Sequence, residues 1–164
     1  MRRLIKKRRR KKNKGLVDTR VLTSRIVEIE DDGLGSLFNP EERVTSEEIW
    51  LDTVIDISDV MAVTENPDHS FSSILWIPSG NIITSTDIKE SEEWLNRKGS
   101  DLLETRIKIA DRAEEGVWVR TIIDLSSVKM VSYSDIGGRA VIWLGEERVI
   151  VEDSYDQVRK RMVH

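Results

Sequence analysis

The chain has 164 residues, of which 38% are hydrophobic and 34% charged, and its formal net charge is −4. Cys is absent, which excludes disulfides and thiolate chemistry. No apolar run approaches the roughly 20 residues that cross a bilayer, and the basic start lacks the apolar segment of a signal peptide. We therefore expect a cytoplasmic protein with no membrane insertion.

The apolar residues indicate a mainly β fold. The sequence contains 34 Ile and Val against 4 Ala. Side chains branched at Cβ suit a pleated sheet better than the interior of a helix. We expect an α+β protein dominated by strands.

The basic residues are concentrated at the N-terminus, and we assign residues 1–19 to a basic arm. Residues 1–14 hold ten Lys or Arg and no acid, and the other 150 residues carry 16 basic and 30 acidic side chains, so the body is acidic. An arm with ten cations and little to bury is expected to stay disordered without a partner. Its chemistry suits nucleic-acid phosphates. The predicted phosphate-binding residues are Arg2, Arg3, Lys6, Lys7, Arg8, Arg9, Arg10, Lys11, Lys12 and Lys14.

The sequence of the body resembles two tandem copies of one unit. Residues 49–60 match residues 117–128 in Trp, Thr, Ile-Asp, Ser and Val at identical spacing. Residues 74–77 also match 141–144, and we align residues 22–26 with 103–107. We predict a tandem duplication with a first β-rich unit over 20–99 and a second over 100–164.

Each unit is expected to contain five strands followed by one short helix. Short connections favour an antiparallel meander, curled into a small barrel-like unit with the helix on one opening. Residues 33–48 are interpreted as an irregular surface loop. The strands are predicted at 21–31, 49–57, 60–65, 73–77 and 81–86, and at 102–110, 117–125, 128–133, 140–144 and 148–152.

Helix-capping patterns locate the two helices. Asp87 is the predicted N-cap of the first helix, Glu90 completes a capping-box pattern, and Gly99 stands at its end. Asp153 or Ser154 caps the second helix, which has basic residues in its last turn.

Four tryptophans divide into two kinds. Alternation along residues 49–57 places Trp50 on the outer face among acids, and Trp118 is placed likewise. These candidate surface aromatics either pack between the units or stack on nucleic-acid bases. Trp76 and Trp143 lie in strands that are apolar on both faces, so we expect them in the core.

Two repeated patterns are interpreted as structural. Asp56-x-Ser58 and Asp124-x-Ser126 end a strand, where a carboxylate bonding to backbone N–H groups fixes a tight connection. Gly137-Gly138 indicates a hairpin turn.

A magnesium nuclease is a minor alternative. Asp68, Asp87 and Lys89 have the residue types of a site in which two carboxylates hold Mg²⁺ and a lysine orients water. Asp87 falls at the predicted helix cap, however, and the second unit has no equivalent set. His69 and His164 lack metal-ligand spacing. We therefore expect no enzyme activity, no cofactor and no metal.

These observations favour a non-enzymatic nucleic-acid-associated protein. The arm would contact DNA or RNA phosphates without strong sequence specificity, and the duplicated β body would serve packing or protein interaction. The alternative is a structural or assembly protein of a virion or ribonucleoprotein, whose arm docks into an acidic partner.

Overall fold

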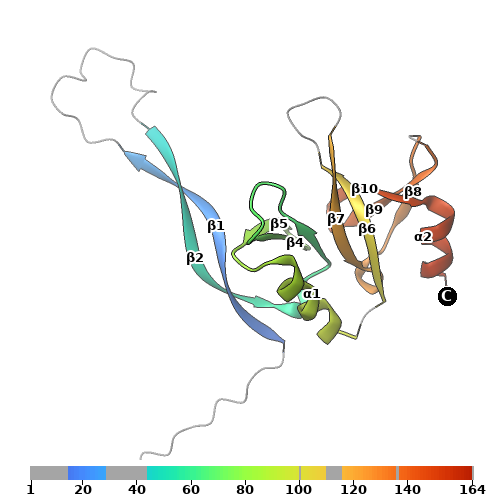
Figure 1. Ribbon diagram of the computed structural model, residues 1–164, viewed down its shortest axis with the longest axis horizontal. Helices are drawn as coiled ribbons and strands as arrows, with labels where there is room; N and C mark the ends of the chain where they lie inside the picture. The colour runs from blue at the N-terminus through green and yellow to red at the C-terminus, as the bar shows by residue number, and fades with distance from the viewer. Residues whose placement is uncertain (1–14, 29–43, 100, 110–115, 136, 164) are drawn as a thin grey trace, which may run out of the picture.

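The computed structural model describes residues 15–28, 44–99, 101–109, 116–135 and 137–163. Over these residues the chain forms one antiparallel sheet of ten strands with two α-helices and two short 3-10 helices (Figure 1). The strands are β1 (Leu16–Glu28), β2 (Val44–Asp56), β3 (Ala62–Glu65), β4 (Ser73–Ile77), β5 (Gly80–Thr84), β6 (Leu102–Ile109), β7 (Val117–Asp124), β8 (Val131–Tyr133), β9 (Arg139–Leu144) and β10 (Glu147–Ser154). The helices are η3 (Ile57–Asp59), α1 (Ile88–Arg97), η4 (Leu125–Ser127) and α2 (Tyr155–Met162).

The strands follow one another across the sheet in the order β2-β1-β5-β4-β3-β7-β6-β10-β9-β8. The first half of the chain supplies β2-β1-β5-β4-β3, and the second half repeats that order as β7-β6-β10-β9-β8. Each half consists of a hairpin, β1–β2 or β6–β7, and a three-stranded meander, β3–β5 or β8–β10. The two parts are joined by strands far apart in the sequence, β1 with β5 and β6 with β10. The two halves meet where β3 pairs with β7.

The sheet is open, so the predicted barrel-like closure is wrong. Closing the first half would require β3 to turn back onto β2. The side of β3 that faces away from β4 is instead paired with β7 of the second half. The strands β2 and β8 remain as the two edges of the sheet.

The first hairpin is longer than the sequence pattern predicts. β1 begins at Leu16, so residues 16–19, assigned to the arm, are part of a strand. β2 begins at Val44, so residues 44–48 are strand and not irregular loop. The two strands pair from Leu16↔Asp56 to Glu28↔Val44, and this ladder satisfies backbone groups that a loop would leave to water. The other strands lie within three residues of their predicted ends.

The register of the ladders corrects one part of the internal alignment. Asp56 pairs with Leu16, and Asp124, which matches Asp56 in sequence, pairs with Leu102. The counterpart of Leu102 is therefore Leu16, and the alignment of residues 22–26 with 103–107 is wrong. In the corrected register LVDTRV over 16–21 corresponds to LLETRI over 102–107.

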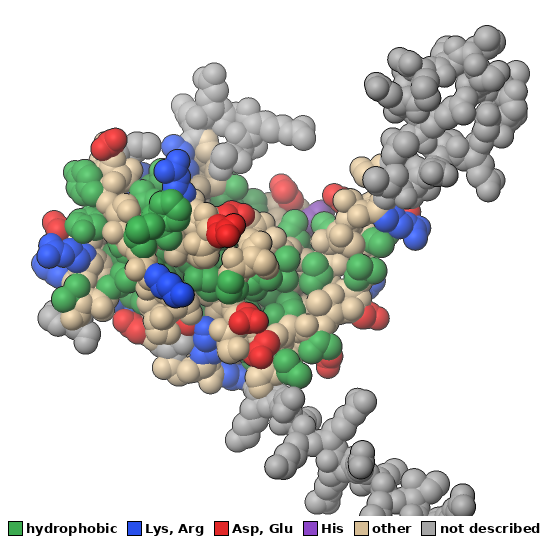
Figure 2. All heavy atoms as spheres, turned by 180° about the vertical axis from the view of Figure 1, so that it is seen from behind, with side chains coloured by type: hydrophobic (Ala, Val, Ile, Leu, Met, Phe, Trp, Pro, Cys, Tyr) green, Lys and Arg blue, Asp and Glu red, His purple; other side chains and the backbone are tan. Residues whose placement is uncertain are grey.

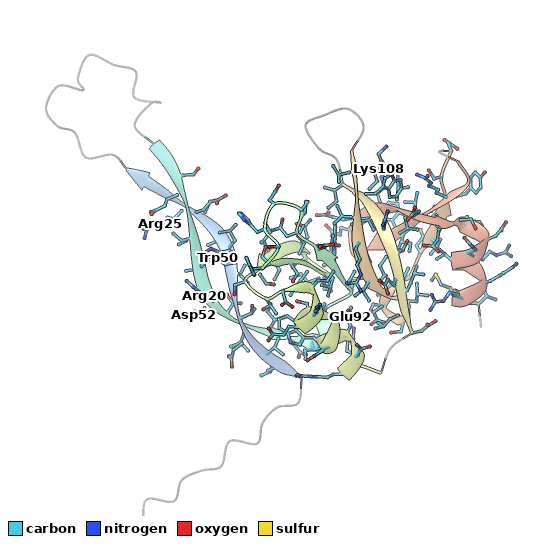
Figure 3. All side chains as sticks on the ribbon, in the orientation of Figure 1. Arg20, Arg25, Trp50, Asp52, Glu92 and Lys108 are labelled. Atoms are coloured by element: carbon cyan, nitrogen blue, oxygen red, sulfur yellow. The ribbon has the colours of Figure 1, made fainter. Side chains whose placement is uncertain are left out.

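Beyond its base, the β1–β2 hairpin projects from the body as a two-stranded ribbon (Figure 1). β1 pairs with β5 only at Val21↔Thr84, so no third described strand supports the residues beyond. Figure 3 shows Trp50 and Arg25 along this ribbon, with Arg25 nearer its outer end.

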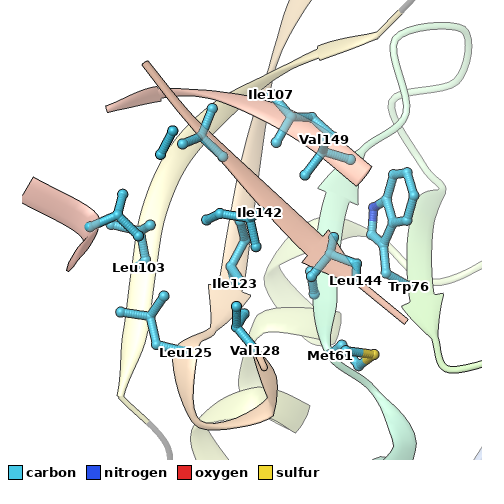
Figure 4. Packing of buried hydrophobic residues seen from close by; sticks show 14 residues of the cluster. Met61, Trp76, Leu103, Ile107, Ile123, Leu125, Val128, Ile142, Leu144 and Val149 are labelled. Atoms are coloured by element: carbon cyan, nitrogen blue, oxygen red, sulfur yellow. The ribbon is translucent and has the colours of Figure 1, made fainter. Parts of the chain in front are cut away.

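The hydrophobic core consists of two clusters that each cross the junction between the halves. The larger lies mainly in the second half and includes Met61 and Trp76 from the first (Figure 4). The smaller surrounds Trp94 and Leu95 of α1 and includes Ile122 of β7. The predicted core position of Trp76 is confirmed. Trp143 is only half-buried, since it alternates along β9 with the buried Ile142 and Leu144 and lies on the other face of the strand.

The helix caps are largely as predicted. The Asp87 carboxylate accepts the Glu90 N–H at 2.9 Å and caps α1, and Gly99 follows the helix with φ +67°. Ser154, not Asp153, caps α2 through a capping box with Gln157. Asp153 instead accepts a hydrogen bond from Thr105. In the part of the chain that the structure describes, no helix is long and apolar enough to cross a membrane.

Candidate functional site

The predicted site residues divide between two parts of the chain. The ten basic residues of the arm lie outside the described residues. Trp50 and Trp118 are described, and both are half-buried. The structure does not bring them together, because four strands of the sheet separate β2 from β7.

A groove of about 640 Å³ lies beside Trp118, over β6 and β7. It combines an aromatic ring with charges of both signs, so it carries no uniformly basic surface. Its wall contains the carboxylates of Glu65, Glu104 and Glu152 and the guanidinium groups of Arg106 and Arg120. Lys108, labelled in Figure 3, pairs with Trp118 across the two strands.

Arg120 is held inside this groove by acidic neighbours. Its Nε donates to Glu104 Oε1 at 2.7 Å, and a terminal nitrogen lies 3.5 Å from Glu92 of α1. The hydrogen bond with Glu104 raises the pKa of Arg120 above its ordinary value, so the group stays a cation. Because two of its three nitrogens already have carboxylate partners, Arg120 links α1 and β6 to β7.

One face of Trp118 is already occupied. The guanidinium carbon of Arg139 lies 4.4 Å from the centroid of the indole ring, a cation–π arrangement. A base stacking on that face would have to displace Arg139. Trp50 pairs with Leu22 across the β1–β2 ribbon, where neighbouring side chains pack together. The choice between packing and base stacking therefore stays a prediction for both tryptophans.

The two aspartates interpreted as structural are confirmed as caps. Asp56 accepts the Ser58 N–H at 2.9 Å and Asp124 accepts the Ser126 N–H at 3.0 Å, each beginning a 3-10 helix. Each carboxylate therefore fixes the turn that follows its strand. The turn between β8 and β9 likewise contains Gly137 and Gly138, both with positive φ.

A buried ion pair at Asp124 was missed by sequence reasoning. Lys98 Nζ lies 2.6 Å from Asp124 Oδ2, and it also donates to the Val60 carbonyl at 2.8 Å. Burial disfavours the charged carboxylate, but hydrogen bonds from Lys98, Ser126 and Ser127 outweigh it and lower the pKa of Asp124 to about 2. No local pattern could reveal the pair, since Lys98 is 26 positions away and follows a helix.

Among the residues weighed for a nuclease, Asp87 has a structural role. The Asp87 carboxylate is committed to the cap of α1, and Lys89 is exposed on that helix. Asp68 lies in the turn after β3, where its N–H donates to the side chain of Asn66 at 3.0 Å. Among the described side chains no group of three or more His, Asp or Glu is placed to hold a metal ion.

The surface of the described body has no separate basic region on the face seen in Figure 2. Lys and Arg side chains there alternate with Asp and Glu, and hydrophobic side chains run between them. No protein-family model, curated protein or solved structure matches this chain.

Proposed function

We propose that this protein is a cytoplasmic, non-enzymatic, nucleic-acid-associated protein that binds phosphates through its N-terminal arm. The observation that carries the proposal is the charge of residues 1–14, which hold ten Lys or Arg and no acid. Such a segment releases the counterions of a nucleic acid when it binds, and it contacts the backbone without reading bases.

The charges of the described body support a phosphate-binding role for the arm and not for the body. Several of its arginines already have carboxylate partners, as in Arg25 with Glu47, Arg120 with Glu104 and Arg161 with Asp101. These paired cations are less available to phosphates, and the acids of the body outnumber its bases, so the arm is the segment best suited to phosphate contacts. The β body then serves packing and protein interaction.

A salt titration tests the role of the arm. With all ten charges engaged, log K falls against log salt with a slope of about −9, and with half engaged the slope is about −4 to −5. We expect a truncated protein that begins at Gly15 to lose this binding. Undiminished binding by the truncated protein would overturn the proposal.

A charge-neutralised arm of unchanged length is the matched control. Replacing residues 8–12 with glutamine removes half of the ten cations while it keeps the chain length. The slope of log K against log salt should fall by about half. An unchanged slope would show that these side chains do not contact phosphate.

A second candidate, a structural or assembly protein, is favoured by the open edges of the sheet. β2 and β8 both end the sheet without a partner strand among the described residues. Exposed strand edges are templates for pairing with another chain. In this role the arm would dock into an acidic partner.

We also propose that the two halves arose by tandem duplication. The match of residues 49–60 with 117–128 supports this origin. The order of strands, which is the same in both halves, supports it independently. Residues or strands at matching places in the two halves are counterparts of one another.

A further inference from the structure

The junction between the halves joins two strands whose counterparts lie at the edges of the sheet, each with one side unpaired among the described strands. Within the chain, β3 pairs with β7. In the strand order, the counterpart of β3 is β8 and the counterpart of β7 is β2. These counterparts are the two edges of the described sheet. The chain therefore presents, on opposite edges, the same two kinds of strand that it joins internally.

Residues buried at the internal junction have exposed counterparts at the edges. Ile122 on β7 is 2% exposed and Ala62 on β3 is 0% exposed. Their counterparts, Val54 on β2 and Met130 beside β8, are 58% and 46% exposed. The edges thus leave in water aliphatic side chains at places where the junction buries them.

We infer that a second copy of this chain covers these edges, with β8 of one copy pairing antiparallel to β2 of the next. The register follows from the junction, where Ala62 pairs with Ile123. The corresponding pair between copies is Met130 opposite Ile55. The partner is thus another molecule of the same chain, joined head to tail.

The side chains that this register brings together are complementary. Lys129 would lie opposite Asp56, an exposed lysine against an exposed carboxylate. Ser132 would lie opposite Thr53. At the internal junction their counterparts, Thr64 and Thr121, have hydroxyl oxygens 3.0 Å apart. A charge pair and a hydroxyl pair therefore both fit the same register.

The backbone of β8 also presents the required groups. The Met130 carbonyl accepts the Trp143 N–H, and the Ser134 N–H donates to the Arg139 carbonyl, so these even-numbered residues bond to β9. In an antiparallel ladder the alternate residues point the other way. The N–H and carbonyl of Val131 therefore face the free edge.

A hollow over the first hairpin supplies space for the helix of the neighbour. It measures about 460 Å³ and is lined by Asp18, Thr19, Arg20, Asp52, Thr53 and Val54. In the second half, α1 reaches only one end of the corresponding place, where Trp94 and Leu95 share a cluster with Ile122, the counterpart of Val54. The counterparts of four other lining residues border the open groove beside Trp118, namely Glu104, Thr105, Arg106 and Arg120. The counterpart helix, α2 of the copy that supplies β8, would lie over Val54 at that end of the hollow.

Sedimentation equilibrium on the full chain tests the inference. The protein is treated with nuclease and kept in high salt, so that nucleic acid cannot bridge copies. We expect the weight-average mass to rise with concentration above the 18.9 kDa of one chain. A mass of 18.9 kDa at every concentration up to the millimolar range would overturn the inference.

Matched variants locate the contact. Val54→Lys should weaken association at least tenfold, because it places a charge at the centre of the paired edge. Val117→Lys is the control, since Val117 is also exposed on a strand but lies outside the proposed contact. Equal association by the two variants would contradict the proposed edge. Thermal melts establish that both are folded.

A mixing experiment distinguishes head-to-tail pairing from symmetric pairing of two β2 edges. Val131→Pro removes the outward N–H of β8, and Lys129→Glu is a second β8 variant that places like charges opposite Asp56. At a concentration where the unchanged protein associates, Val54→Lys and Val131→Pro should each be monomeric alone, and their mixture should form pairs and nothing larger. Full association of both β8 variants alone would overturn the head-to-tail arrangement.

The inference rests on the correspondence of the halves and on the packing role proposed for the β body. It does not depend on the arm. If the protein binds nucleic acid through its arm but remains monomeric, the phosphate-binding proposal stands and this inference fails. Association of the full chain without any binding to nucleic acid, or with binding that the protein beginning at Gly15 keeps undiminished, gives the reverse result.

Discussion

The strand ends at Asp56 and Asp124 share a sequence pattern and a local fold, yet their surroundings differ. Both aspartates cap a 3-10 helix through the N–H of the serine two residues on. Asp56 is exposed, and its hydrogen-bond partner is Ser58. Asp124 is buried and also bonds to Lys98 and Ser127.

The difference comes from the place of each strand in the sheet. β7 has neighbours on both sides, and Lys98 after α1 reaches over Asp124 to the Val60 carbonyl before β3. β2 is an edge strand, and no described element covers Asp56. The comparison shows that one local motif acquires a second role, as the anchor of a buried ion pair, only where the sheet continues past it.

The largest expected effects come from the apolar side chains beside the two aspartates. Ile123 is buried in the larger cluster and Ile55 in the smaller one. Replacing either with alanine should cost about 2–5 kcal/mol in the free energy of unfolding, with the greater loss for Ile123→Ala in the interior strand. Urea unfolding measures both losses. One severe and one neutral substitution would break the equivalence of the two positions.

Removing the cation of the buried Lys98–Asp124 ion pair should have the next largest effect on stability. Lys98→Met leaves Asp124 buried without its counter-charge, and we expect a loss of about 3 kcal/mol in the free energy of unfolding. Lys89→Met is the control. Lys89 is exposed on α1, the helix that Lys98 follows, and its replacement should change stability little. If the two variants unfold at the same urea concentration, the ion pair has no structural role.

The same pair predicts a dependence of stability on pH. The pKa of Asp124 is about 2 in the folded protein against 3.8 for the free side chain. Because the folded value is lower, its stabilisation is complete above pH 4 and is lost as the pH falls from about 4 to about 2. Thermal melts of the wild type and of Asp124→Asn across this range measure the effect. The variant should show a flatter pH profile between these values, and identical profiles would contradict the assignment.

The smallest expected effect concerns Trp118, which has a cation over its ring. Arg139→Ala should reduce the free energy of unfolding by about 0.5–1 kcal/mol, because the cation–π contact is partly exposed. Arg148→Ala, an exposed arginine on β10, is the control and should change stability less. Chemical denaturation of the two variants provides the measurement. Equal losses of stability in the two variants would show that the cation–π contact at Trp118 adds nothing beyond the loss of an exposed arginine.

Local patterns in the sequence were sufficient for most elements of the fold. Capping residues such as Asp87 and turn residues such as Gly137 and Gly138 act through their own backbone neighbourhood. Alternating Ile and Val side chains likewise predict strands from a few positions. These signals determined the mainly β class, the positions of both helices and the two Asp-x-Ser connections.

The long hairpin and its register depended on pairing that no short pattern contains. The segment LVDTRV over 16–21 matches LLETRI over 102–107, but this became evident only when the ladders aligned Leu16 with Asp56 and Leu102 with Asp124. A slip of register leaves the local composition of a strand almost unchanged. The ends of β1 and β2 therefore followed from tertiary structure.

The sequence by itself determined the separation of a basic arm from an acidic body, because charge is a sum over residues and needs no fold. It also determined the matching motifs around Asp56 and Asp124. Only the tertiary structure decided that the sheet stays open, that β3 joins β7, and that Lys98 reaches Asp124. These features depend on which strand edges meet, and contacts between residues far apart in the chain are decided by the packing of the whole sheet.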